Sequence, residues 1–83
     1  MPEDVAQQVI QIVAGKSNML LDQIEQESSL NDDLGINSLD LVKLIFTLED
    51  EFNIDFFSDE EDEIQTVRDL IDATARKIFE KEE

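Results

Sequence analysis

Hydrophobic residues recur at helical spacing near both ends of the chain. Near the N-terminal end they fall at i, i+4, i+7 and i+8, which predicts a helix over Glu3–Ala14 that Gly15 ends. Near the C-terminal end, the sequence "TVRD" predicts a helix that starts at about Thr66. The first stripe consists of Val5, Val9, Ile12 and Val13. The second consists of Val67, Leu70, Ile71, Thr74, Ala75, Ile78 and Phe79.

The middle of the chain contains a third long apolar pattern and one short one. A helix is predicted over Ser38–Glu51, with Asn37 or Ser38 as its N-cap and Asp40 in its first turn. A short helix is expected after Ser58, where "SDEE" has the form of a capping box. The alternating stretch "FNIDFF" is too short to outweigh these helices as a strand signal. The pattern therefore predicts an all-α fold, a small four-helix bundle of three longer helices and one short helix.

The segment 16–37 lacks sustained periodicity and forms a long connection between the first two long helices. Loops of this length are unusual in small domains and are often functional. Five apolar residues are expected to pin it to the core: Met19, Leu20, Leu21, Ile24 and Leu30.

The helix over 38–51 carries more apolar residues than one buried stripe requires. One row consists of Leu41, Leu44, Ile45, Leu48 and Phe52, and a second consists of Leu39, Val42 and Phe46. Either the helix is buried on two sides, or the second row is partly exposed and docks against partners. The pattern alone favours burial.

Composition narrows the possible functions. The 83 residues and 41% hydrophobic content indicate one folded domain, residues 1–83. The absence of Cys and His excludes disulfides, thiolate zinc sites and any Ser–His pair, so no catalytic residue is predicted. No metal site is predicted either, because a calcium-binding loop with Gly35 at its sixth position would have Leu30 at its first. A net charge of −16 argues against nucleic-acid binding. It is explained either by partners with basic surfaces or by solubility alone, and the charge by itself does not decide between them. No signal peptide or membrane-spanning run is visible, so a cytoplasmic protein is expected. The chain is also expected to be a monomer.

Ser38 has two interpretations. A serine at a helix start is most often an N-cap. It can also be a modification site, because the N-terminus of a helix favours an attached phosphate. Gly35 would leave the preceding backbone free of side chains for an approaching enzyme.

The stretch "DDLGINSLDLVKLIFTLEDEFNIDF", followed by "IQTVRDLID", resembles the acyl carrier proteins from about Ser28 to Ile78. The resemblance implies a four-helix bundle that is not an enzyme. It implies that a phosphopantetheinyl transferase, with magnesium, attaches 4′-phosphopantetheine from coenzyme A to Ser38. The terminal thiol would carry acyl intermediates of fatty acid, polyketide or related biosynthesis, which can lodge between the helices. The alternative is a non-carrier acidic bundle that binds a basic partner.

The resemblance also reverses the assignment of the second apolar row. In this family the helix after the serine recognises acyl-transferring and synthase enzymes, which implies that Leu39, Val42 and Phe46 are contact residues. The acidic residues around them are Asp40, Glu49, Asp50 and Glu51. Two positions depart from the family pattern: Asn37 replaces the usual Asp, and Lys43 replaces a common acid. Both indicate a specialised carrier with its own partners.

Overall fold

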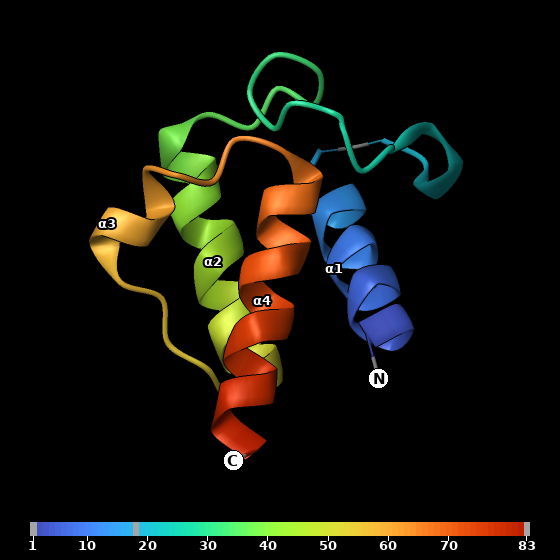
Figure 1. Ribbon diagram of the computed structural model, residues 1–83. Helices are drawn as coiled ribbons and strands as arrows, with labels where there is room; N and C mark the ends of the chain where they lie inside the picture. Colours follow the sequence, from blue (N-terminus) through green and yellow to red (C-terminus); the bar gives the residue numbers. More distant parts are fainter. Residues whose placement is uncertain (1, 18, 83) are drawn as a thin grey trace.

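The computed structural model describes residues 2–17 and 19–82, which form four α-helices and one short 3-10 helix. Figure 1 shows α1, α2 and α4 packed side by side, with α3 standing apart at one flank and the long loops gathered at one end. The elements are α1 (Pro2–Ser17), η1 (Leu21–Gln23), α2 (Ser38–Phe52), α3 (Ser58–Glu61) and α4 (Val67–Glu82). The predicted all-α bundle is confirmed. None of the helices in this described part is long and apolar enough to cross a membrane.

Side-chain caps fix where α3 and α4 begin, and a left-handed residue fixes where α2 ends. At the start of α4, the Asp69 carboxylate accepts a hydrogen bond from the backbone N–H of Thr66 (3.2 Å). In return, the Thr66 hydroxyl accepts a hydrogen bond from the backbone N–H of Asp69 (3.1 Å). This is the predicted capping box. The box predicted at Ser58 is shifted by one residue, because Glu60 accepts from the backbone N–H of Phe57 at 2.7 Å. α2 ends at Asn53, whose left-handed conformation (φ 57°) is typical of a helix C-terminus.

α1 continues through Gly15 to Ser17, so the predicted stop at Gly15 is wrong. A glycine in a helix costs about 1 kcal/mol relative to alanine, which is less than packing of one apolar face supplies. Val9 and Val13 on that face are completely buried.

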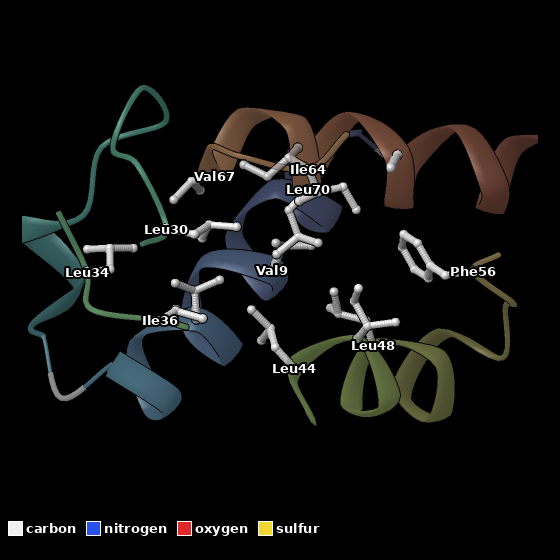
Figure 2. Packing of buried hydrophobic residues seen from close by; sticks show 14 of the residues in the cluster. Val9, Leu30, Leu34, Ile36, Leu44, Leu48, Phe56, Ile64, Val67 and Leu70 are labelled. Carbon is white, nitrogen blue, oxygen red and sulfur yellow. The ribbon is translucent and has the colours of Figure 1, made fainter. Parts of the chain in front are cut away.

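The core lies between α1, α2 and α4, and the loop before α2 closes it (Figure 2). Val9, Leu44, Leu48 and Leu70 from the three long helices point toward one another in Figure 2. Leu34 and Ile36 are buried as well, although no periodic pattern predicted them. Phe79, expected in the α4 stripe, is 66% exposed. It lies nine residues after Leu70, which at about 100° per residue places it on the opposite side of the helix.

The loop between α1 and α2 is held to the segment before α4 by backbone hydrogen bonds. The N–H of Leu30 donates to the carbonyl of Gln65 (2.9 Å), and the N–H of Val67 donates to that of Ser28 (3.1 Å). Ile24 and Leu30 are buried as predicted, and Met19 is partly buried. Leu20 and Leu21 are 66% and 51% exposed, so their prediction as core anchors is wrong. Leu21 lines a surface hollow with Gln7, Ile10 and Gln11 of α1, and neither Leu20 nor Leu21 belongs to the buried core.

Candidate functional site

A compact turn over residues 29–36 positions the start of α2. Ser29 is its centre, because its backbone N–H donates to Asp33 (2.7 Å) and its carbonyl accepts from the backbone N–H of Asp33 (3.0 Å) and Leu34 (3.1 Å). Gly35 has φ +70°, a left-handed conformation that glycine adopts without steric cost. A Cβ at Gly35 would meet no atom within 4 Å, so conformation explains this glycine more directly than crowding.

Asn37, and not Ser38, is the N-cap of α2. Its side-chain oxygen accepts a hydrogen bond from the backbone N–H of Asp40 at 2.8 Å. Ser38 is the first helical residue and is exposed, and no hydrogen bond joins its hydroxyl to another described residue. The interpretation of Ser38 as the N-cap is therefore wrong, because Asn37 is the cap. The neighbouring N–H groups of the first turn point toward the N-terminal end of the helix, where an anion is favoured.

A groove of about 410 Å³ adjoins Ser38. One wall comes from the turn and the start of α2, including Ile36 and Leu41. The other comes from Glu61 at the end of α3 and from Asp62 and Ile64 in the segment that follows. Its lining combines the apolar side chains of Ile36, Leu41 and Ile64 with polar groups of Asn31, Asp32 and Gln65. Such a groove can accept a flexible chain that has both amide and hydrocarbon parts.

Two members of the second apolar row of α2 are exposed. Leu39 is 64% exposed and Phe46 is 62% exposed, so the pattern-based prediction of burial on both sides is wrong. Only Val42 is partly buried. The first row packs inward as predicted, with Leu44, Ile45 and Leu48 fully buried. α2 therefore presents two large apolar side chains to solvent on the same helix as Ser38.

The polar residues of α2 differ in how freely they face solvent. Lys43 and Asp50 are exposed, as are Asn37 and Glu51, while Asp40 is partly buried. The Glu49 carboxylate accepts a hydrogen bond from the backbone N–H of Phe56 at 2.8 Å and so holds the segment that follows α2. This contact gives Glu49 a structural role that its sequence position did not indicate.

Sequence reasoning missed Lys77, which connects α3 to α4. Its ammonium group lies 2.8 Å from Glu60 Oε1 and 5.2 and 5.1 Å from the ring centres of Phe56 and Phe57. Burial alone would raise the pKa of Glu60, but the hydrogen bond from Lys77, the Phe57 N–H and the charges of Lys77 and Arg76 outweigh it and lower the pKa. Because these contacts join residues far apart in sequence, no local pattern could have revealed them.

Comparisons with known proteins agree with the geometry. The family model described as "Phosphopantetheine attachment site" matches residues 7–74. The chain is 38% identical over 73 residues to an acyl carrier protein of Chlorobium phaeobacteroides, covering 88% of this chain and 94% of that protein. It is 41% identical over 75 residues to one of Porphyromonas gingivalis, covering 90% and 96%.

Solved structures give the same result for the fold. A crystal structure of an acyl carrier protein from Thermotoga maritima superimposes with a TM-score of 0.80 at 28% identity, covering 95% of this chain and 92% of that one. An acyl carrier protein from Enterococcus faecalis gives 0.79 at 26% identity, covering 93% and 98%. With its exposed serine at the start of α2, its adjoining groove and these relatives, the chain belongs to the acyl carrier protein family, whose members carry phosphopantetheine and are not enzymes.

Proposed function

We propose that Ser38 is the residue that carries 4′-phosphopantetheine in this acyl carrier. The observation that supports this most strongly is that Asn37 caps α2, which leaves the exposed Ser38 hydroxyl at the positive end of the helix. The chain has no His, the usual base that activates a serine hydroxyl, so the transferase and its magnesium would activate Ser38. When attached, the group supplies a terminal thiol that carries acyl chains as thioesters.

The groove beside Ser38 fits such a group. Asn31, Asp32 and Gln65 offer polar atoms to amide groups, while Ile36, Leu41 and Ile64 offer apolar contact to hydrocarbon. These residues would shield an attached chain from water between the turn, α2 and α3. The 83 residues thus act as one carrier domain.

The exposed face of α2 is the proposed recognition surface for the transferase and for acyl-transferring and synthase enzymes. Leu39 and Phe46 would fill shallow apolar pockets, with Val42 at their edge. Asp40 and Asp50 would meet basic groups, with Glu49 contributing through its charge while it holds Phe56. We infer a specialised set of partners from Asn37 and Lys43, each of which makes this face less negative than the family pattern does.

We expect the carrier to dock on each partner as a single chain in the cytoplasm. The test of attachment is the intact mass after incubation with coenzyme A, magnesium and a promiscuous phosphopantetheinyl transferase. The wild type should gain one phosphopantetheine, and Ser38→Ala should gain none. Ser58→Ala is a matched control, because Ser58 is also exposed at the first residue of a helix. A gain in Ser38→Ala, or none in the wild type with several transferases, contradicts the proposal.

Recognition is tested by Phe46→Ala. This variant should slow the attachment of phosphopantetheine by the transferase, or the transfer of acyl groups with a partner enzyme, while the free energy of unfolding hardly changes. Phe46 is 62% exposed, so little of its side chain is lost from the core. A stability loss of several kcal/mol, as for a buried Phe, would contradict the assignment to a contact surface.

A further inference from the structure

Thr74 is an exception in the apolar core. It lies on the inner side of α4 with Val67 and Leu70, at i, i+3 and i+7, and all three side chains are completely buried. Among the described residues it is the only buried polar one, and its hydroxyl has no hydrogen-bond partner there. Because an unpaired buried hydroxyl destabilises a fold, a role beyond core packing is expected for it.

The helix that carries Thr74 does not satisfy its hydroxyl. Inside an α-helix, a threonine hydroxyl can donate to a backbone carbonyl three or four residues earlier. Thr47 does so in α2, where its hydroxyl donates to the carbonyl of Lys43 at 3.1 Å. Thr74 makes no such bond to Leu70 or Ile71. Its hydroxyl therefore remains available to a group that enters the core from outside.

The groove beside Ser38 leads into this core. Three residues that line the groove, Leu30, Ile36 and Ile64, also belong to the buried cluster. α1 packs closely against both α2 and α4, while the backbones of α2 and α4 seldom come close to each other. A hydrocarbon chain that starts in the groove leaves water when it moves inward, which favours its entry between α2 and α4.

Thr74 lies deep in the bundle when approached from the groove. Figure 1 shows that α2 and α4 both start at the end where the loops gather and run in the same direction. α4 begins at Val67, so the seven residues from there to Thr74 span about 10 Å along the helix. An extended chain advances about 1.2 Å per bond, so it reaches the level of Thr74 after about eight bonds.

We infer that Thr74 selects acyl chains that carry an oxygen midway along their length, as a hydroxyl or a keto group. The inference rests on the proposed attachment at Ser38. The Thr74 hydroxyl can donate to either kind of oxygen and can accept from a hydroxyl of the chain. A plain hydrocarbon chain leaves it unpaired. An oxygen close to the thioester stays in the groove, where Asn31 and Gln65 offer polar partners, and does not reach Thr74.

The test compares three chains loaded on the full-length protein. A promiscuous phosphopantetheinyl transferase loads wild type, Thr74→Val and Thr74→Ser from dodecanoyl, 3-hydroxydodecanoyl and 8-hydroxydodecanoyl coenzyme A. Intact mass establishes that each chain is attached, and circular dichroism melts then measure how far each attached chain raises the melting temperature. Valine keeps the shape of threonine without its hydroxyl, and serine keeps the hydroxyl.

In wild type the 8-hydroxydodecanoyl chain should raise the melting temperature more than the dodecanoyl chain does. In Thr74→Val the order should reverse, by about 4–8 °C in all, which is the effect of about one hydrogen bond in a domain of this size. Thr74→Ser should keep the wild-type order, and the 3-hydroxydodecanoyl chain should respond to neither substitution.

Two results would overturn the inference alone. One is the same order of the three chains in wild type and Thr74→Val, and the other is a dependence on Thr74 that only the 3-hydroxydodecanoyl chain shows. If the intact mass shows that no chain is attached to the wild type, the proposed attachment fails and this inference fails with it.

Discussion

Replacing Lys77 by methionine removes a side chain of α4 that contacts three groups: the Glu60 carboxylate in α3 and the rings of Phe56 and Phe57. The ammonium group binds Glu60 at 2.8 Å, and the two side chains are only 12% and 25% exposed. A charge-assisted hydrogen bond of this kind contributes about 1.5–3 kcal/mol, and each contact of a cation with an aromatic ring adds about 0.5–1 kcal/mol. Residual exposure screens part of this. We expect Lys77→Met to lower the free energy of unfolding by about 2–3 kcal/mol, a large part of the roughly 4–12 kcal/mol available to such a chain.

Urea denaturation followed by circular dichroism measures this loss. Lys43→Met is the matched control, because it makes the same change at an exposed lysine and alters net charge equally. It should change the free energy of unfolding by no more than about 0.5 kcal/mol. Hydrogen exchange of the amides over 57–63 should also accelerate in Lys77→Met, since α3 loses its connection to α4.

A double-mutant cycle with Glu60→Gln separates the ion pair from other effects of the substitution. The losses of unfolding free energy in the two single variants should not add up in the double variant, because each single substitution already breaks the same contact. If Lys77→Met costs no more than Lys43→Met, or if the cycle shows no coupling, the ammonium group does not hold α3 and the reasoning is refuted.

Three further predictions concern single side chains. Asn37→Ala should lower the melting temperature by the equivalent of about 1 kcal/mol through loss of the cap, whereas Asn37→Asp should retain it; equal melting of both variants would contradict the capping role. Thr74→Val should stabilise the chain by about 1 kcal/mol in urea titrations, because the buried Thr74 hydroxyl has no hydrogen-bond partner among the described residues; a loss of stability would show that the hydroxyl is satisfied. Because the pKa of Glu60 is lower in the folded chain than its ordinary value of 4.5, the Glu60 carboxylate stabilises the fold fully above pH 4.5, and this stabilisation is lost as pH falls through the lowered pKa. The difference in stability between wild type and Glu60→Gln should therefore shrink only below about pH 4.5.

The long helices could be predicted because their signals are local. Caps and periodicity lie within a few residues of one another, and they correctly placed α2 at Ser38 and α4 next to Thr66. The same local signals led to error at Gly15, where the packing of Val9 and Val13 outweighs the low helix propensity of glycine.

Exposure of apolar side chains could not be predicted from the pattern. Leu39 and Phe46 repeat at helical spacing as core residues do, and only the position of the neighbouring helices determines that they face solvent. Leu20 and Leu21 were misjudged for the same reason, since the direction of the chain after α1 is a tertiary property. The Lys77 contacts join segments that no sequence spacing connects.

The central claim is that Ser38 carries the arm, and the attached mass on the natural protein tests it most directly. The protein is purified from cells that produce it, cleaved, and its peptides are fragmented in a mass spectrometer. We predict one phosphopantetheine, free or acylated, on the peptide that contains "GINSLD", located at Ser38. An arm on any other serine, or protein that lacks the arm throughout growth, would contradict the account.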